Sequence, residues 1–250
     1  MIKIENVEVV GWEPTIRGMR NPKNSWEKSD SCVKGAHFCS DYCGIVECHN
    51  ISGLNLGPND LDLMSRLAKG GPVHAKYRRM ITVYLDITAP LYWWKEFDTY
   101  KVGTVANSCS TMHKIHEKEF TLDDFSHEHL MGDIDYDHTD YIILETINAL
   151  NYWRNLYLEI DKDIKEKQFH DSKVRNELIR LQKRYWWQMI QLLPSSYNQR
   201  RTIMLNYEVL TNIYESRKNH KLDEWRELCK WIEILPYSEI ITGEVKESEN

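Results

Sequence analysis

Asn206 and Arg217 are two polar residues near the C-terminus whose spacing would let them act on one ligand. If both belong to a single helix, eleven residues at about 100° each return to the same face, about 16 Å further along. The residues between them on that face are apolar, so the face is expected to point inward. An inward arginine needs a partner, because an isolated buried charge is costly. Its partner is either a ligand phosphate or carboxylate, or a protein carboxylate such as Glu145 or Glu224.

A second candidate segment spans Pro90–His113 and reads PLYWWKEFDTYKVGTVANSCSTMH. Its first half is aromatic and charged, and its second half is rich in small hydroxylated side chains. A loop of this composition can surround an anionic or polar ligand with backbone N–H groups and hydroxyls. The alternative is a hydroxyl-rich turn between a strand and a helix. The polar residues of the second half are Thr104, Asn107, Ser108, Ser110 and Thr111.

His74 follows a Gly-Gly-Pro turn and precedes the basic residues Lys76, Arg78 and Arg79. Positive charges at the start of a strand could bind phosphates. They could also be solvated charges that keep the strand edge from pairing with another chain. The sequence leaves both interpretations open.

Most of the cysteines gather in one segment of the chain. Tetrahedral metal sites typically use cysteine or histidine ligands in closely spaced pairs. The spacing here, C-x6-C-x3-C-x4-C, contains no C-x2-C pair, so ordinary thiols are favoured over a metal site and no metal ligand is assigned. The residues concerned are Cys32, His37, Cys39, Cys43, Cys48 and His49. Cys109 and Cys229 lie in patterned segments and are expected to be small buried hydrophobes.

Length and composition limit the classes of protein to which this chain can belong. Its 250 residues and 42% hydrophobic content, with few glycines and prolines, suit a folded core. The net charge of −6 argues against broad binding to nucleic-acid polymers. No apolar run approaches the roughly 18 residues of a membrane span and no secretory signal is present, so a cytoplasmic protein is expected. The 9 Trp and 14 Tyr, against 5 Phe, favour partly wet clefts and interfaces.

The elements that must position these residues follow from hydrophobic periodicity and turn residues. Strands are expected at Ile2–Val10 and Met80–Thr88, and a short helix at Asn59–Lys69. Further helices are expected over Thr139–Ile160, Val174–Leu192 before Pro194, Ile203–Arg217 and Leu222–Leu235. We therefore predict one α+β domain over residues 1–243, with a mixed sheet and a helical C-terminal half, followed by a polar tail at 244–250.

The order of these pieces resembles the flavin-dependent thymidylate synthases, a family that uses FAD and a reduced folate to methylate dUMP. That family begins with a strand and a short arginine-containing segment, which Thr15–Asn21 resembles. A short helix and a histidine before a strand follow, as His74 does here, and the strand meets a proline, as in Ile87–Pro90. The resemblance covers roughly residues 2 to 235 and implies the family's fold.

The family signature is a Gln, an Arg-His-Arg and then Asn-Glu-x-Ser-x-Arg-Tyr, and this chain carries a partial counterpart. The corresponding segments are Lys95-Glu96, Thr99-Tyr100-Lys101 and Asn107–His113. Asn107 and Ser110 keep their relative spacing, whereas Ser108 replaces an acidic residue and one residue is inserted between the two halves.

The C-terminal match has no gap. The family carries a Leu-Pro, an Asn twelve residues after the proline and an Arg eleven residues after that Asn, and Leu193-Pro194, Asn206 and Arg217 reproduce this spacing. Ile190 and Glu208 stand where the family has two further arginines. The family's arginine at the position of Ile190 contacts the nucleotide phosphate. Either the substrate differs or other basic residues replace them, the candidates being Arg17, Arg20, Arg200 and Arg201.

The resemblance implies roles for individual residues. Arg217 is expected to be catalytic and to bind substrate, together with Glu96, Asn107, Ser108 and Ser110. His74, Thr99, Tyr100, Lys101 and Asn206 are expected to bind the cofactor. Tyr92–Trp94 either stacks on flavin or packs in the core.

The function implied is reductive one-carbon transfer to a pyrimidine deoxynucleotide, dUMP or a related nucleotide, as part of nucleotide biosynthesis. FAD, a reduced folate and NADPH are the expected cofactor and co-substrates, and a homotetramer is the expected assembly. The alternative is a catalytically inactive nucleotide- or protein-binding module on the same scaffold.

Overall fold

The computed structural model describes residues 2–32, 54–130, 139–169 and 171–243 of the chain. The chain falls into two compact units. Unit 1 comprises Met1–Lys3, Ile87–Thr99 and Asn107–Arg201, and unit 2 comprises Ile4–Asp86, Tyr100–Ala106 and Thr202–Asn250. The single domain over residues 1–243 stays a prediction, and the tail at 244–250 lies outside the described residues.

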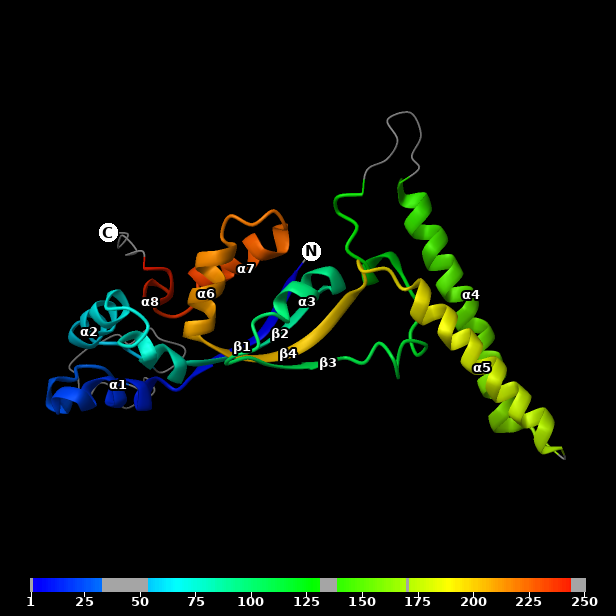
Figure 1. The fold of residues 1–250 in the computed structure, drawn as a ribbon, viewed down its shortest axis with the longest axis horizontal. Helices are drawn as coiled ribbons and strands as arrows, with labels where there is room; N and C mark the ends of the chain where they lie inside the picture. Colours follow the sequence, from blue (N-terminus) through cyan, green and yellow to red (C-terminus); the bar gives the residue numbers. More distant parts are fainter. Residues whose placement is uncertain (1, 33–53, 131–138, 170, 244–250) are drawn as a thin grey trace. The chain divides into compact units, whose positions relative to one another are not determined.

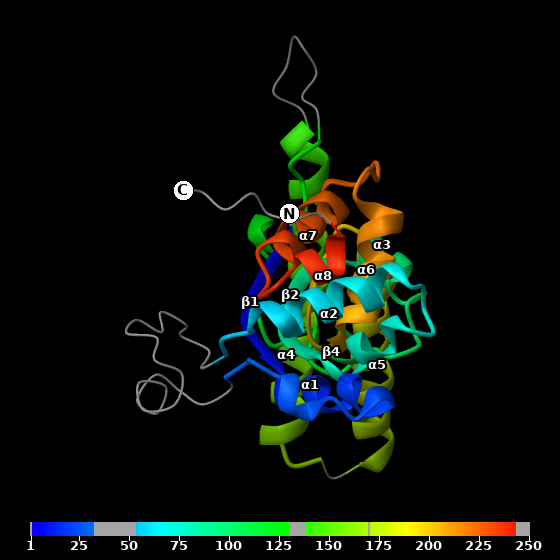
Figure 2. The same cartoon turned by 90° about the vertical axis from the view of Figure 1, so that its left-hand side faces the viewer.

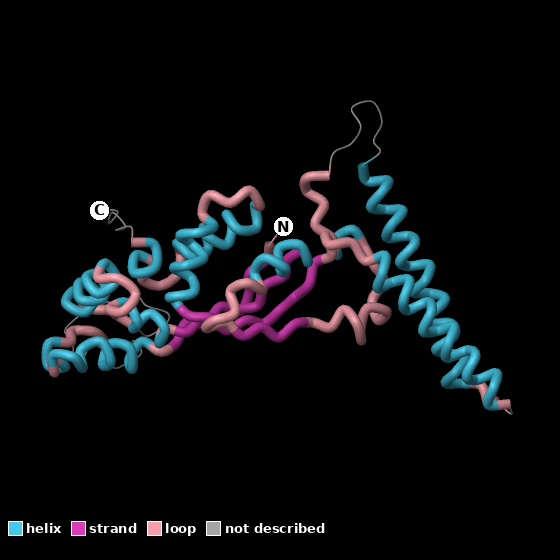
Figure 3. The backbone as a smooth tube through the Cα atoms, in the orientation of Figure 1, coloured by secondary structure: helices cyan, strands magenta, loops and turns pink. Residues whose placement is uncertain are grey.

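Helices and strands are interspersed along the chain, which confirms the α+β class (Figure 1 and Figure 3). The strands form a four-stranded sheet in the order β1-β2-β4-β3. The larger elements are β1 (Lys3–Val10), α1 (Trp12–Arg20), α2 (Pro58–Lys69), β2 (Thr82–Pro90), α3 (Leu91–Phe97), β3 (Val105–Ser108), α4 (Thr139–Glu166), α5 (Ser172–Leu192), β4 (Asn198–Asn206), α6 (Tyr207–Arg217), α7 (Asp223–Glu233) and α8 (Glu239–Thr242). The short 3-10 turns are η1 (Asn21–Lys23), η2 (Trp26–Lys28), η3 (Ala75–Met80) and η4 (Leu122–Asp124). Among the described residues, no helix combines the length and the apolar character needed to cross a membrane.

Most of the expected helices and strands are present, but one expected helix begins later in the chain than predicted. The apolar stripe that ends before Pro194 forms α5, as predicted. The helix expected over Ile203–Arg217 begins only at Tyr207, because the preceding residues form β4. In β4 the side chains of Ile203 and Leu205 are buried and Met204 between them is less so, which is the alternation of a strand. Ile203 therefore fits both a helical and a strand period, and the sequence alone could not separate the two.

In unit 1, the long helices α4 and α5 lie side by side and enclose an apolar cluster (Figure 1). The cluster consists of Ile115, Phe120, Phe125, Ile143, Ile147, Leu150 and Met189. Helix α3 adds a second group of buried rings, in which Trp93 and Trp94 are 0% and 1% exposed and both contact Phe97. Trp94 Nε1 donates a hydrogen bond of 2.9 Å to the backbone oxygen of Gln199. Trp93 and Trp94 thus pack in the core, and Trp94 also ties α3 to β4.

In unit 2, helix α6 is the central element and packs against η3, α7 and α8 (Figure 2). Its buried side chains include Leu210 and Ile213, and α7 adds Trp225. Tyr207, at the first position of α6, donates from its hydroxyl to the backbone oxygen of Pro236 over 2.7 Å. Burial raises the pKa of Tyr207 above its ordinary value, so this donor stays protonated. The hydrogen bond fixes the start of α6 against the chain that leads into α8.

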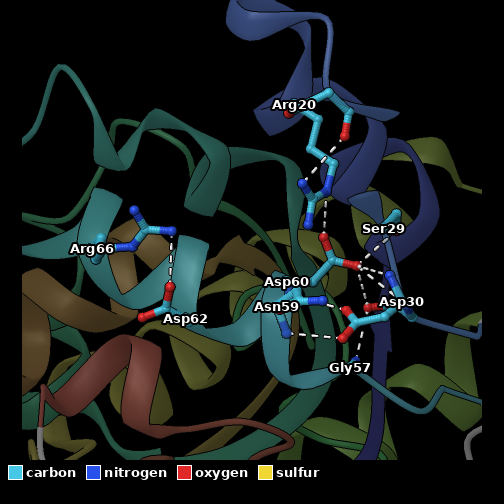
Figure 4. A network of polar contacts seen from close by, with 10 residues as sticks. Arg20, Ser29, Asp30, Gly57, Asn59, Asp60, Asp62 and Arg66 are labelled. Atoms are coloured by element: carbon cyan, nitrogen blue, oxygen red, sulfur yellow. Dashed lines mark hydrogen bonds and ion pairs between the residues drawn. The ribbon is translucent and has the colours of Figure 1, made fainter. Parts of the chain in front are cut away.

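A buried ion pair in unit 2 joins α1 to α2 (Figure 4). Asp60 is fully buried, and its Oδ1 accepts a 2.6 Å hydrogen bond from Nε of Arg20. Its Oδ2 accepts 2.7 Å bonds from the hydroxyls of Ser29 and Ser31 and 3.2 Å bonds from two backbone N–H groups. Burial by itself would raise the pKa of Asp60, but the hydrogen bonds from Ser31, Ser29 and Arg20 outweigh it and lower the pKa below its ordinary value.

Replacing Asp60 tests this network. We expect Asp60→Asn to lower the free energy of unfolding by about 3–5 kcal/mol at neutral pH, because it leaves Arg20 buried without its counter-charge. The pKa of Asp60 is lower in the folded than in the unfolded protein. Its contribution to the free energy of unfolding is therefore present above the unfolded pKa of about 3.9 and is lost as the pH falls through the folded-state pKa. The free energies of unfolding of wild type and variant, measured with urea, should therefore converge at acidic pH.

Asp62→Asn is the matched control on the same helix. Asp62 pairs with Arg66 on the surface, where both side chains are more than 60% exposed, so its loss should cost no more than about 0.5 kcal/mol. Equal destabilisation by the two variants would contradict the account of the network.

Candidate functional site

The first turn of α6 is positioned by Asn206, the last residue of β4. Its Oδ1 accepts a 3.1 Å hydrogen bond from the backbone N–H of Val209, so Asn206 caps the helix. The prediction that Asn206 and Arg217 share a helix face is therefore wrong. Asn206 lies before the helix and Arg217 is its last residue, so the two mark its opposite ends.

The segment 100–106 lies directly against this turn, and Gly103 makes the close approach possible. Gly103 has a φ of +78°, and a Cβ at this position would lie 2.9 Å from Nδ2 of Asn206 and 3.2 Å from Cγ2 of Val209. Only glycine fits both the left-handed backbone and the short distance. Because Gly103 has no side chain, the amide of Asn206 packs directly against its backbone.

At the other end of α6, the guanidinium of Arg217 lies against two aromatic side chains that are neighbours of each other. Its Nε donates a 3.0 Å hydrogen bond to the hydroxyl of Tyr100. Its central carbon is 4.7 Å from the ring centroid of Trp225 and 5.8 Å from that of Tyr100. Both rings present a face that attracts a cation. Segment 100–106 therefore contacts both ends of the helix, through Gly103 and through Tyr100.

Glu208, in the first turn of α6, forms an ion pair with Arg79 of η3. Nε and Nη2 of Arg79 reach the same oxygen, Oε1, over 3.1 and 2.7 Å. The second oxygen, Oε2, is buried and has no hydrogen-bond partner among the described residues. The adjacent Arg78 is buried, so the expected basic cluster is not a uniformly solvated edge. His74 and Lys76 are exposed.

The other predicted site residues lie in unit 1, except Lys101, which is exposed in unit 2. Asn107 and Ser108 are exposed on β3. The hydroxyl of Thr99 donates to the backbone oxygen of Glu96 over 2.7 Å. The hydroxyl oxygen of Ser110 accepts hydrogen bonds from the backbone N–H groups of Met112 and His113, at 3.2 and 3.0 Å. Their roles in binding stay predictions.

Two of the four arginines considered as replacements for lost phosphate contacts have structural partners. Arg20 pairs with Asp60, as described above. Arg201 pairs with Asp98 over 2.7 Å, and its guanidinium carbon lies 4.2 Å from the ring centroid of Trp94. Arg17 and Arg200 are exposed.

The cysteine predictions have mixed outcomes. Burial raises the pKa of the Cys229 thiol to about 11, as expected for a small buried hydrophobe, whereas Cys109 is exposed and that prediction was wrong. The rest of the predicted cluster, from His37 to His49, lies outside the described residues. Within the described ranges, no group of three or more His, Cys, Asp or Glu side chains is arranged to hold a metal ion.

Sequence reasoning missed three features of the site: Gly103, Trp225 and the pairing of Arg79 with Glu208. Gly103 was detectable as the lone glycine of a hydroxyl-rich loop, since an isolated glycine indicates a turn or a close backbone approach. Trp225 carries no such local signal, because α7 brings it to Arg217 only in the folded chain.

Comparison with solved structures assigns the fold. The chain is similar to thymidylate synthase X (ThyX) from Helicobacter pylori with FAD and dUMP, at a TM-score of 0.57 and 15% identity, covering 99% of this chain and 100% of that one. A second structure of flavin-dependent thymidylate synthase ThyX from Helicobacter pylori, complexed with FAD and dUMP, gives a TM-score of 0.53, 15% identity and coverage of 97% and 100%. The UMP/dUMP methylase PolB from Streptomyces cacaoi, bound with 5-Br dUMP, gives 0.51, 14% identity and coverage of 97% and 95%. The chain thus has a thymidylate synthase X-like fold.

Sequence comparisons add nothing to this assignment. No protein-family profile matches the chain, and no curated protein matches it.

The approach of segment 100–106 to α6 makes Gly103→Ala a direct test of the site's geometry. The change should lower the free energy of unfolding by about 2–5 kcal/mol, since it combines a strained left-handed backbone with a steric overlap. Gly71→Ala is the control: Gly71 has a φ of +88° but nothing within 4 Å of its added Cβ, so only the backbone strain of about 1–2 kcal/mol remains. Urea unfolding measures both, and equal losses would refute the close approach.

Proposed function

We propose that this protein is a divergent flavin-dependent thymidylate synthase-like enzyme that transfers one carbon reductively to a pyrimidine deoxynucleotide, dUMP or a related nucleotide. The observation that carries the proposal is Arg217, which contacts Tyr100 and Trp225 at the end of the helix that Asn206 begins. The fold supports it, because solved structures with this fold contain FAD and dUMP.

In this proposal, Arg217 donates hydrogen bonds to the pyrimidine ring and stabilises the negative charge that develops on it. Donors aimed at developing charge give the largest catalytic effect when they are held in place beforehand. Tyr100 and Trp225 supply that restraint, since the phenol fixes Nε and the indole face holds the guanidinium. When bound, reduced flavin supplies the hydride, a reduced folate supplies the methylene carbon, and NADPH restores the flavin.

The remaining assignments follow from the resemblance. Glu96, Asn107, Ser108 and Ser110 are proposed to bind the nucleotide with Arg217. His74, Thr99, Tyr100, Lys101 and Asn206 are proposed to bind FAD. We also propose a homotetramer and a cytoplasmic location.

The first turn of α6 fits the ring or chain part of a flavin better than its phosphates. Asn206 packs its amide directly against the backbone of Gly103, and we propose that a flat or slender polar group of the flavin contacts this pair. Thr104 Oγ1 is buried without a partner among the described residues, so it can accept or donate one hydrogen bond to such a group. Glu208, in contrast, places a carboxylate where a phosphate would bring more negative charge.

The second candidate function is a catalytically inactive nucleotide- or protein-binding module on the same scaffold. Ile190 favours it, because this side chain packs against the apolar cluster of unit 1 where the resemblance expects a phosphate-binding arginine. The two candidates differ in turnover and not in fold.

Arg217→Ala separates the two candidate functions. If the enzyme proposal is right, turnover of the correct pyrimidine nucleotide should fall by about 10²–10³-fold, because the main charge-stabilising donor is lost. Loss of the C5 proton of dUMP, in the presence of flavin, reduced folate and NADPH, measures that turnover. Arg180→Ala, on the exposed surface of α5, is the control and should turn over like wild type.

The folded state of the variant must be checked by circular dichroism and by its oligomeric state. A folded Arg217→Ala protein with unchanged turnover would contradict the role of Arg217. Wild-type protein that binds dUMP but never turns it over would favour the inactive module. An unfolded Arg217→Ala protein would favour the structural alternative, in which Arg217 only holds the helix end in place.

A further inference from the structure

Ser110 follows Cys109, and residues of β4 hold both backbone polar groups of Cys109. Its N–H donates to the backbone oxygen of Arg200 over 2.9 Å. Its oxygen accepts a 2.9 Å hydrogen bond from Nε2 of Gln199, a side chain that is only 8% exposed. Because a peptide group is planar, fixing the oxygen of Cys109 also fixes the backbone N–H and the Cα of Ser110.

The amide of Gln199 has one orientation that satisfies both of its neighbours. Oε1 accepts from Nε of Arg201 over 3.0 Å, and Nε2 donates to Cys109. A guanidinium only donates and a carbonyl only accepts, so a flipped amide would lose both bonds. Arg201 is itself held by Asp98, over 2.7 Å, and by the ring face of the buried Trp94, 4.2 Å away. A chain of contacts thus runs from the core of unit 1 to this peptide group.

A second contact holds the chain just after Ser110. Nε1 of Trp186, on α5, donates a 2.9 Å hydrogen bond to the backbone oxygen of Met112. The N–H of the same Met112 donates to the hydroxyl oxygen of Ser110. Ser110 therefore lies between two fixed backbone groups, one held from β4 and the other from α5. All of these residues belong to unit 1.

The local hydrogen bonds decide what the hydroxyl of Ser110 can offer a ligand. A serine hydroxyl has two acceptor lone pairs and one donor hydrogen. The N–H groups of Met112 and His113 occupy both lone pairs, at 3.2 and 3.0 Å. The group can therefore act toward a ligand only as a donor, and its partner must be an acceptor such as a carbonyl or phosphate oxygen.

We infer that Gln199 and Trp186 are positioning residues that hold Ser110 as a hydrogen-bond donor for the nucleotide. Gln199 acts through the oxygen of Cys109, and Trp186 acts through the oxygen of Met112. A donor that is already held in place loses less conformational freedom when the ligand binds, and this strengthens binding. The inference rests on the proposed function, which assigns Ser110 to the nucleotide.

A double-mutant cycle between Gln199 and Ser110 tests the inference. Gln199→Glu keeps an oxygen for Arg201 but puts an acceptor in place of the donor to Cys109, so the oxygen of Cys109 is released. The probe is whichever of dUMP, dCMP and UMP binds wild-type protein most tightly in isothermal titration calorimetry. We expect Gln199→Glu to raise its dissociation constant about tenfold, the effect of one well-made hydrogen bond. Ser110→Ala should raise it at least as much, and the double variant should raise it no further.

Two further variants sharpen the test. Gln168→Glu, exposed just after α4, adds the same charge and should leave the dissociation constant unchanged. Trp186→Phe keeps an apolar ring but removes the N–H, so it should weaken nucleotide binding, and this loss should also disappear in the Ser110→Ala background. FAD affinity reports general damage, because most of the residues proposed to bind FAD lie in unit 2. We expect it to stay unchanged in every variant.

The possible outcomes separate the inference from the proposed function. Equal losses of nucleotide and FAD affinity in Gln199→Glu would indicate general damage to the fold, and the inference would be wrong. It would also be wrong if the effects of Gln199→Glu and Ser110→Ala multiplied, or if wild-type protein bound the nucleotide and neither change mattered. The proposed function survives each of these results. If wild-type protein binds none of the three nucleotides, the proposed function and the inference are both wrong.

Discussion

The close approach of Gly103 to Asn206 is the constraint on which the rest of the site depends. It requires a residue without a side chain and with a positive φ, and it fixes segment 100–106 along α6. With that segment in place, Tyr100 reaches Arg217 at the far end of the helix. Segment 100–106 thus contacts α6 near both Asn206 and Arg217, the two polar residues that mark the opposite ends of this helix.

The surroundings of Arg217 include aromatic surface from Tyr100 and Trp225. The excess of tryptophan and tyrosine in the composition has two distinct uses in the structure. Trp93 and Trp94 pack in the core of unit 1, whereas Trp225 holds a guanidinium by its ring face. Glu208 and Ile190 stand where the resemblance expects arginines, and neither position offers a positive charge to a phosphate.

The sequence predicted the α+β class, helices α2 and α5 and the approximate positions of β1 and β2, because their periodicities and turn residues are unambiguous. It misplaced Asn206, because Ile203 fits both a strand and a helix and because asparagine commonly caps a helix that it does not enter. The partners of Arg217 were beyond the sequence for another reason. Tyr100 comes from a segment remote in the chain, and Trp225 lies on the next helix, α7, so only tertiary packing brings the two rings to one guanidinium. The ion pair between Asp60 and Arg20 was hidden for the same reason.

The most direct test of the account is a crystal structure of the protein with flavin and dUMP. We predict that Arg217 donates to the pyrimidine ring while Tyr100 and Trp225 keep their contacts, and that the flavin lies against Asn206 and Gly103. A nucleotide bound elsewhere, with Arg217 touching only its protein partners, would contradict the central claim.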